Sequence, residues 1–285
     1  MDNSTSIYAV ILNWNRADLT ARCVESVIRY TPETRIIVVD NGSTDESVSL
    51  LKQIFPAVKI IENNKNLGFG AGNNPGITYA IEHGADYIWL LNNDVTVEAG
   101  SLASMLNKFD ESPETGIVGS AVYDIAKPDK LLALGGGMIT AGRSYAVHCS
   151  DLSQLPDISY ITGSSMLIKA DVLKETGLFD EKFFMYWEDA DLCFRVRKAG
   201  YKISVADDSK VLHANGASSK DSALKSYYIF KSGLYFQKKH FSKLDVARFI
   251  FCFFCDVIVR DILTLNWEHV ASVSSMILLN RKPGV

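Results

Sequence analysis

The stretch YAVILNW, at positions 8–14, places five consecutive apolar residues before a polar end. A run of this kind is typical of a parallel strand that is buried on both faces of a sheet. Helix-like spacing of apolar residues follows it, and a second strand-like stretch, RIIVVDN, then occupies 35–41. Because parallel strands are joined by crossover connections, usually helices, this alternation predicts an α/β fold with a mostly parallel sheet.

The alternation of strands and helices continues to about residue 124. Further strands are expected at 58–63, 87–94 and 117–124. The segment Ser43–Glu46 fits a capping box at the start of one helix, and Pro75 fits the first turn of another. The second half of the chain is less regular. We expect a flexible turn at 135–139, strands at 161–170, 201–206 and 210–214, and helices from Ser222 onward.

Composition and charge narrow the class of protein. The chain has 285 residues, of which 47% are hydrophobic and 22% charged, and its net charge of −4 argues against nucleic-acid binding. The N-terminus has neither a basic segment nor a long apolar run, so we expect no secretory signal. The five cysteines lack regular spacing. We therefore expect reduced thiols and a cytoplasmic protein, which could reach the inner face of the cell membrane.

Polar residues follow each of the first four predicted strands. They are Asn13-Trp14-Asn15, Asp40-Asn41, Asn63-Asn64 and Asn92-Asn93-Asp94. Turns alone favour Asn and Asp, so one such end carries little weight. Four of them at the carboxyl edge of one sheet, where ligands of α/β proteins bind, indicate a site for a polar ligand.

Two of the residues at strand ends have the chemistry of metal or phosphate ligands. Asp94 closes an apolar strand, and Mg²⁺ is commonly held by one or two protein carboxylates together with substrate phosphates. His213 ends a later predicted strand in KVLHANG and could bind a metal or a phosphate. The alternatives are a plain turn at Asp94 and a structural role for His213.

The stretch FFMYWEDADLCFRVRKAG, at 183–200, places aromatic residues directly before three carboxylates, Glu188, Asp189 and Asp191. Its apolar spacing predicts a helix that ends at Gly200. A purely structural interpretation is that the helix dipole stabilises the acids and that Asp191 pairs with Arg195, an interaction of about 0.5 kcal/mol. That interpretation explains the charges but not the aromatic residues before them.

These stretches, in this order, resemble the family 2 inverting glycosyltransferases of the GT-A fold, and look closest to the bacterial rhamnosyltransferase-like branch. The matching stretches lie within residues 7–218. They are VILNWNR, VVDNGSTD, NLGFGAGNN, WLLNNDV, ITGSSMLIK, FFMYWEDADLCFRVRKAGY and VLHANGAS. The resemblance implies a Rossmann-like GT-A domain over 1–220 and a helical C-terminal extension over 221–285. The nucleotide-sugar half would cover about 1–124 and the acceptor half about 125–220.

The resemblance also implies roles for individual residues. The nucleotide-sugar site would contain Asn13, Asn15, Asp40, Asn66, Asn74, Asn92, Asn93, Asp94 and Gly163. Asp94 would be the main metal carboxylate, because Asn92 stands where the family has its first Asp of a D-x-D motif, and His213 would join the metal or the diphosphate. Asp189 falls on the catalytic base. Tyr186, Trp187 and Glu188 would face the acceptor.

We therefore expect a transferase that depends on Mg²⁺ or Mn²⁺ and moves a sugar from a nucleoside-diphosphate donor to a saccharide or lipid-linked glycan, in cell-surface polysaccharide synthesis. The resemblance favours dTDP-L-rhamnose as donor, with a UDP-hexose or UDP-galactofuranose as alternatives. A nucleotidyltransferase would need a basic Gly-rich loop after the first strand, which NWNRAD does not supply. A non-catalytic nucleotide- or glycan-binding protein is a further alternative, against which Asp94 and Asp189 argue.

The segment 246–263 is apolar but contains four charged residues, so we do not expect it to span a membrane. It could be a helix packed on the domain, or an interfacial helix that contacts the membrane carrying a lipid-linked acceptor. Five lysines upstream would favour an anionic membrane surface. They are Lys225, Lys231, Lys238, Lys239 and Lys243.

Overall fold

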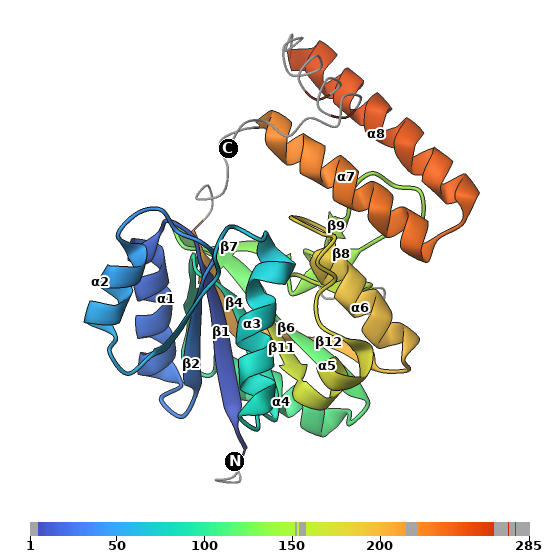
Figure 1. The fold of residues 1–285 in the computed structure, drawn as a ribbon. Coiled ribbons are helices and arrows are strands. Elements are labelled where there is room, and N and C mark those ends of the chain that lie inside the picture. The colour runs from blue at the N-terminus through green and yellow to red at the C-terminus, as the bar shows by residue number, and fades with distance from the viewer. Residues whose placement is uncertain are drawn as a thin grey trace.

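A computed structural model describes residues 5–151, 153, 158–214, 222–264, 273 and 277, without the side chains of 222 and 257–264. Its centre is a nine-stranded sheet with helices on both faces (Figure 1). The strands are β1 (Ile7–Asn13), β2 (Arg35–Asp40), β3 (Lys59–Glu62), β4 (Tyr87–Asn92), β5 (Val95–Val97), β6 (Thr115–Asp124), β7 (Lys127–Leu134), β11 (Ser165–Lys169) and β12 (Lys202–His213). The helices are α1 (Ala17–Tyr30), α2 (Ser47–Ile54), α3 (Phe69–Glu82), α4 (Ser101–Glu111), α5 (Ala170–Thr176), α6 (Glu188–Lys198), α7 (Ser222–His240) and α8 (Lys243–Thr264).

The strand order is β3-β2-β1-β4-β11-β6-β12-β5, with β7 beside β6. The first four strands in this order are parallel, as predicted. Beyond β4 the sheet is mixed, because β11 runs antiparallel to both of its neighbours while β6 and β12 are parallel to each other. The predicted α/β architecture is therefore present, with a parallel half and a mixed half.

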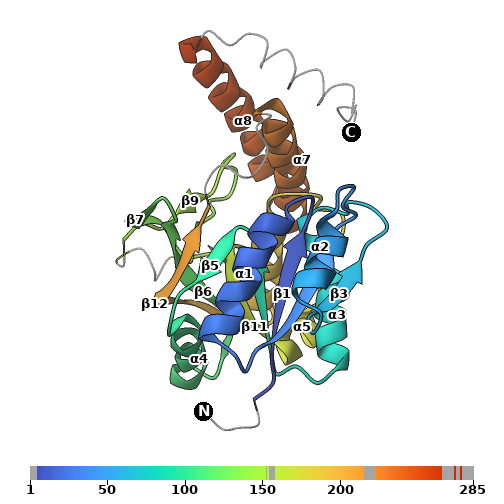
Figure 2. The same cartoon turned by 90° about the vertical axis from the view of Figure 1, so that its left-hand side faces the viewer.

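Each face of the sheet has its own hydrophobic core. Ile7, Ala9 and Ile11 pack with the buried faces of α1, α2 and α4, which Figure 2 shows on one side of the sheet. Tyr8 and Val10 point to the opposite side and pack with α3, α5 and α6. Alternate side chains of β1 thus enter opposite cores, which explains its uninterrupted apolar run.

Helix α3 begins earlier than the sequence predicts. Pro75 lies inside the helix rather than in its first turn, since α3 starts at Phe69. The segment FGAGNNPG has low intrinsic helix propensity, and close packing holds it in place instead. A Cβ added at Gly76 would lie 2.6 Å from Val39, and one at Gly68 would lie 1.9 Å from the Phe184 carbonyl oxygen. The glycines therefore let this helix approach the sheet and a neighbouring loop.

Other departures from the sequence predictions are local. The expected flexible turn at 135–139 contains strand β8 (Gly136–Met138), which forms a small sheet with β9 (Val147–His148) and β10 (Tyr160–Ile161). The two strands expected at 201–206 and 210–214 are one strand, β12, with a register shift between Ala206 and Lys210. The expected capping box is replaced by Asp45, whose side chain accepts the Ser47 N–H at 3.0 Å.

Helices α7 and α8 form a hairpin beside α6 and the small sheet (Figure 1). Phe230, Phe236 and Phe249 from this hairpin belong to the same hydrophobic core as α3 and α6. The domain boundary expected at 220/221 and the end of the VLHANGAS motif lie outside the described residues. Among the helices that the structure describes, none is long and apolar enough to cross a membrane.

Asp191 is the electrostatic link between α6 and α7. Its side chain is fully buried. Arg195 donates to one carboxylate oxygen at 2.9 Å, as predicted from their spacing, and Lys239 and His240 of α7 each lie 2.8 Å from the other oxygen. Burial alone would raise the pKa of Asp191, but hydrogen bonds from His240, Lys239 and Arg195 outweigh burial and lower the pKa to about 2. We therefore expect this network to contribute more than the ~0.5 kcal/mol of an isolated helix pair.

We predict that Asp191→Asn lowers the free energy of unfolding by about 3 kcal/mol, because it removes the buried carboxylate that Arg195, Lys239 and His240 share. The matched control is Asp171→Asn, which removes an exposed carboxylate 2.9 Å from Lys174 and should cost less than about 1 kcal/mol. Because the pKa of Asp191 is depressed, its contribution should persist above about pH 4 and disappear as the pH falls toward 2. Urea unfolding at pH 7 and pH 3 measures both effects, and equal losses for the two variants would contradict the assignment.

Candidate active site

A chain of buried polar side chains joins the ends of β1, β2 and β4. The Asn13 amide donates to Asp40 at 2.8 Å and accepts the Thr20 hydroxyl at 2.7 Å. Asn93, just after β4, donates to the same Thr20 oxygen at 3.1 Å. The polar residues at the strand ends were predicted to lie at one edge of the sheet. This network directly connects the ends of three of those strands.

Asp40 keeps limited capacity for a ligand. It accepts hydrogen bonds from the Ser43 amide, the Ser43 hydroxyl and the Asn13 amide, and it is 3% exposed. A carboxylate has about four lone-pair sites, so one acceptor position remains. Asn15, in the left-handed region at φ +52°, accepts the Thr44 N–H at 2.8 Å beside it. These residues shape the loop at the ends of β1 and β2.

Asn41, rather than Asn66, is the centre of the next loop. The Asn41 amide donates to the Asn66 oxygen and to the Gly68 carbonyl, both at 3.0 Å, and accepts from Asn63 and from the Leu67 N–H. It is 2% exposed. This structural role was not visible in the sequence, where Asn41 was one of several Asn residues at a strand end.

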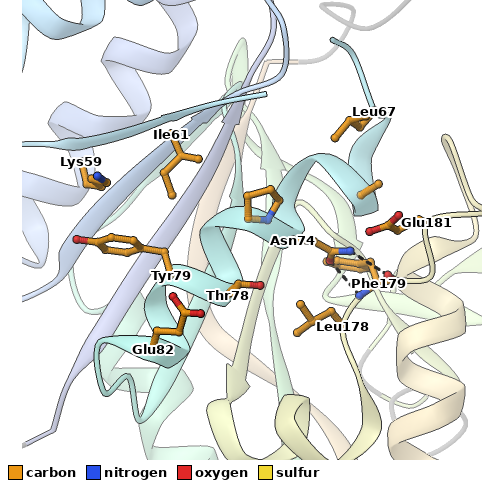
Figure 3. Close-up of a pocket in the computed structure, with 12 residues that line it drawn as sticks. Lys59, Ile61, Leu67, Asn74, Thr78, Tyr79, Glu82, Leu178, Phe179 and Glu181 are labelled. Carbon is orange, nitrogen blue, oxygen red and sulfur yellow. Dashed lines mark hydrogen bonds between the residues drawn. The ribbon is translucent and has the colours of Figure 1, made fainter. Parts of the chain in front are cut away.

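The Asn74 side chain bonds to the Phe179 backbone and not to the strand-end residues. Its amide exchanges two hydrogen bonds with the Phe179 backbone, shown as dashed lines in Figure 3. It lines a groove of about 700 Å³ between β3, α3 and the 178–181 loop. Both polar atoms of this amide are already bonded to Phe179, so we leave Asn74 out of the donor site proposed below.

Asp94 and His213 meet because β5 and β12 are antiparallel neighbours, with His213 opposite Val95. The His213 Nε2 atom lies 3.3 Å from Asp94 Oδ1, and both side chains are largely buried. Within the described chain, Asp94 Oδ1 and His213 Nδ1 are buried without a hydrogen-bond partner. Burial raises the pKa of Asp94, although the charges of His213 and Arg16 oppose that shift. The protein therefore offsets the cost of burying this carboxylate only in part.

The pair Asp94–His213 fits a divalent cation that takes most of its ligands from water and substrate. The described residues contain no group of three or more His, Cys, Asp or Glu side chains that could hold a metal. One carboxylate and one imidazole are nevertheless a sufficient protein contribution when substrate phosphates and water complete the coordination, as is common for Mg²⁺. Asp94 Oδ1 and His213 Nε2, which lie 3.3 Å apart, would supply the two protein ligands.

Arg16 is a residue that sequence analysis did not single out. It follows the β1 end, and its charge is close enough to Asp94 to oppose the upward shift of that carboxyl's pKa. Its guanidinium pairs with Asp18 at 3.0 Å and is 43% exposed. A half-exposed cation beside the Asp94 turn is well placed to meet an anionic ligand. The sequence feature that could have pointed to Arg16 is its position directly after Asn13-Trp14-Asn15, the polar end of the first strand.

Asp189 lies at the start of α6, and the backbone holds both of its oxygens. Gly163 donates to Oδ2 at 3.1 Å and Ala190 donates to Oδ1 at 2.8 Å. Burial raises the pKa of Asp189 above its usual value, and these hydrogen bonds only partly offset the shift. A carboxylate with a raised pKa, fixed in direction and half-buried, has the properties of a general base. Gly163, expected beside the donor sugar, touches Asp189 itself.

The three residues before Asp189 occupy different environments. Tyr186 is half-buried, and burial together with the charge on Glu188 raises the pKa of its phenol. Glu188 is 6% exposed, and its Oε2 atom has no hydrogen-bond partner in the described part of the chain. Trp187 is 6% exposed, with its ring against Phe236 and Phe249. The Trp187 ring therefore has no free face for a sugar, which corrects its assignment to the acceptor.

His148 and Tyr160 form a second feature that the sequence did not reveal. The Tyr160 hydroxyl and His148 Nδ1 are 3.1 Å apart, and they belong to β10 and β9, the two outer strands of the small sheet. The charge of His148 favours the ionised form of Asp189. His148 is exposed and therefore adds a polar group to the side of the site where Asp189 lies.

The family model for glycosyl transferase family 2 matches residues 8–176, which are 169 of the 285 residues. The chain belongs to glycosyl transferase family 2. The family predicted from the sequence motifs is thereby confirmed.

Relatives and a solved structure agree with this assignment. The chain is 29% identical over 226 residues to N-acetylglucosaminyl-diphospho-decaprenol L-rhamnosyltransferase of Mycobacterium tuberculosis, covering 68% of this chain and 73% of that protein. It is 24% identical over 217 residues to galactofuranosyltransferase GlfT1 of the same organism, covering 74% of this chain and 71% of GlfT1. The fold matches a crystal structure of GalNAc-T7 with UDP, GalNAc and Mn²⁺ at a TM-score of 0.65 and 17% identity. That match covers 82% of this chain and 48% of GalNAc-T7, and it confirms the predicted GT-A fold.

We predict that Glu188→Gln makes the protein more stable than wild type as the pH rises. Burial, followed by the charge of Asp189, raises the pKa of Glu188 well above its usual value. Folding is therefore penalised as the pH climbs above the unfolded pKa of about 4.5, and glutamine removes this penalty. Urea unfolding from pH 5 to pH 9 should show a stability difference that grows with pH. The control Glu62→Gln, at an exposed side chain, should show a constant difference, and the same constancy for Glu188→Gln would contradict the prediction.

Proposed function

We propose that the chain is an inverting glycosyltransferase that moves a sugar from a nucleoside diphosphate to a hydroxyl of a saccharide or lipid-linked glycan. The observation that carries the proposal is the presence of two incompletely compensated carboxylate clusters at one edge of the sheet. Asp94 with His213 forms the first cluster, and Glu188 with Asp189 forms the second. The family assignment supports the same activity.

The donor nucleotide is proposed to bind along the ends of β1, β2 and β4. The free acceptor position of Asp40 suits a nucleobase N–H or a ribose hydroxyl. Further contacts would come from the loops around it. We assign to this half Asn13, Asn15, Asp40, Asn66, Asn92, Asn93 and Gly163. Asn13 and Asn66 are already bonded within the protein, so they position the loop rather than bind the ligand directly.

The diphosphate is proposed to lie beside Asp94, His213 and Arg16. Asp94 and His213 would hold Mg²⁺ or Mn²⁺, and when bound there the cation would neutralise charge that develops on the leaving diphosphate. Arg16 would add a cation that belongs to the chain itself. Asp94 and His213 are largely buried, which strengthens their electrostatic interactions.

Asp189 is proposed to remove the proton of the acceptor hydroxyl. Inverting transfer requires this hydroxyl to attack the anomeric carbon on the face opposite the leaving group, while a base takes its proton. Gly163 and Ala190 fix the two carboxylate oxygens, and each oxygen keeps a lone pair for the proton. Tyr186 and Glu188 border the acceptor in this arrangement, and burial there limits hydrolysis of the donor by water.

The sugar is proposed to be L-rhamnose, from a dTDP-linked donor. The similarity to a rhamnosyltransferase supports this choice. The similarity to GlfT1 favours a galactofuranosyl donor as the second candidate. Thermal-shift measurements with dTDP-rhamnose, UDP-galactofuranose and UDP-hexoses in the presence of Mn²⁺ compare them, because tighter binding raises the apparent stability more. A larger shift with a UDP-sugar would replace dTDP-rhamnose in the proposal.

We predict that Asp189→Asn lowers the transfer rate by about 10²- to 10⁴-fold, the usual contribution of a general base. Asparagine keeps the size of the side chain but cannot take the proton. The KM for the donor should stay near the wild-type value, since the nucleotide lies at the ends of β1 and β2. Steady-state kinetics with the donor selected above measure both constants. Near wild-type turnover in Asp189→Asn would remove this residue from the role of base.

We predict that excess EDTA abolishes transfer and that Mn²⁺ or Mg²⁺ restores it. Asp94→Asn and His213→Ala should weaken the stabilisation by Mn²⁺ in the presence of the free nucleoside diphosphate, a readout that does not depend on activity. The control Asp171→Asn changes an exposed carboxylate of α5 that lies 2.9 Å from Lys174. Full activity in EDTA, or an unchanged Mn²⁺ effect in both site variants, would argue against the metal site.

We also propose that α8 contacts an anionic membrane. Leu244 and Phe251 are 64% and 70% exposed, and their spacing places them on one face of the helix. The side chains of Lys225, Lys231, Lys238 and Lys243 on α7 and α8 are exposed and would attract anionic headgroups. A lipid-linked acceptor would then be presented at the same surface.

We predict that the protein floats with vesicles that contain anionic lipid and that Leu244→Asp with Phe251→Asp abolishes this binding. The control Ile54→Asp changes an exposed apolar residue of α2, 51% exposed, and should still float. Failure of the unmodified chain to float would count against membrane contact without affecting the proposed chemistry.

A further inference from the structure

The residues that lead into α6 have an unusual backbone conformation. Tyr186 and Trp187 have φ angles of +66° and +70°, a region that is disfavoured for residues other than glycine. Trp187 precedes the first residue of α6, so this turn sets the direction in which Glu188 and Asp189 point. Two consecutive residues in such a conformation persist only where surrounding contacts hold them.

The aromatic residues before the turn pack against α7. The Phe183 ring lies 4.9 Å from the Tyr235 ring, and the Phe184 ring stacks on Tyr228 at 4.8 Å. Tyr228 and Tyr235 are seven residues apart, so two turns of α7 contact this segment. The backbone of the same segment is tied to α3, because the Phe69 N–H donates to the Phe184 carbonyl at 2.9 Å.

Hydrogen bonds from α7 hold the turn itself. The Ser232 hydroxyl donates to the Met185 carbonyl at 2.8 Å, and the Trp187 indole N–H donates to the Ile229 carbonyl at 3.2 Å. Helix α7 comes close here because Gly233 has no side chain, and a Cβ at this position would lie 3.0 Å from the Trp187 nitrogen. The turn is therefore bonded to α7 on both sides of Tyr186.

Ion pairs extend the contact at each end of this segment. Lys239 of α7 lies 2.7 Å from Asp180 and 2.8 Å from Asp191, so one cation bridges the residues before and after the turn. The Tyr235 hydroxyl also donates to Asp180 at 2.9 Å. Helix α7 thus contacts the chain from 180 to 191 almost continuously.

We infer that α7 is a positioning element for the catalytic base: Ser232 and the Trp187 indole hold the 185–187 turn in its strained conformation and thereby direct Asp189 toward the acceptor. This inference rests on the proposed role of Asp189. Helix α7 would then be part of the catalytic unit, although the sequence placed it in a C-terminal extension. It also gives Trp187 a positioning role, which agrees with its buried ring.

The test compares Ser232→Ala and Trp187→Phe with a matched control, Ser101→Ala. Trp187→Phe removes the indole donor and keeps an aromatic ring in the core. Ser101, also buried, donates to the distant Lys210 carbonyl at 2.6 Å and lies on α4, so its loss tests general destabilisation. The measured quantities are kcat, the KM for the donor, the acidic limb of the pH profile of kcat, and the melting temperature.

We expect both turn variants to lower kcat by about 10- to 100-fold with the donor KM unchanged, because small displacements of a catalytic group are costly. The acidic limb should move to lower pH, since a loosened turn admits water to Asp189. Ser101→Ala should change only the melting temperature. If both turn variants keep wild-type kcat and pH profile while Asp189→Asn is inactive, the role of α7 is overturned and the proposed function stands. An active Asp189→Asn overturns both.

Discussion

Burying a carboxylate costs free energy unless hydrogen bonds or cations offset the loss of water. In this chain, the buried acids whose cost is offset by protein partners differ from those whose cost is not. Asp191 is bonded by Arg195, Lys239 and His240, and its pKa is lowered to about 2. Asp40 accepts three hydrogen bonds from its own loop and from β1. Asp94, Glu188 and Asp189 differ, because burial raises the pKa of each and protein partners do not reverse the shift. To these three acids we assign the metal site, the acceptor contact and the base, whereas Asp40 keeps one acceptor position for the nucleotide.

The mixed half of the sheet brings the two functional clusters to one edge. Antiparallel pairing of β5 with β12 places His213 beside Asp94. Strand β11 lies between β4 and β6, and the residues just before it connect the clusters: Ser164 accepts the Asn92 N–H at 3.1 Å, and Gly163 donates to Asp189 at 3.1 Å. The turn proposed to hold the metal and the proposed base are thus linked through two adjacent backbone residues. A sugar bound between them would have its leaving group on one side and the base on the other.

The sequence predicted the features that depend on local pattern. The strands of the parallel half, the helix that ends at Gly200 and the Asp191–Arg195 pair all follow from spacing. It did not predict features set by distant contacts. Helix α3 starts at Phe69 against its weak propensity because glycines let it pack on the sheet, and Trp187 is buried by a helix some 40 residues later in the chain. Asp94 and Asp189 could be named from motifs, but their incomplete compensation could only be seen once their neighbours were in place.

The central claim is that a base and a leaving-group site face each other across the sugar, which requires inversion at the anomeric carbon. Time-resolved ¹H NMR of the sugar transferred to acceptor, or released to water in the first minutes before mutarotation, tests this claim most directly. The account predicts a product whose anomeric configuration is opposite to that of the donor. A product that retains the donor's configuration would contradict it.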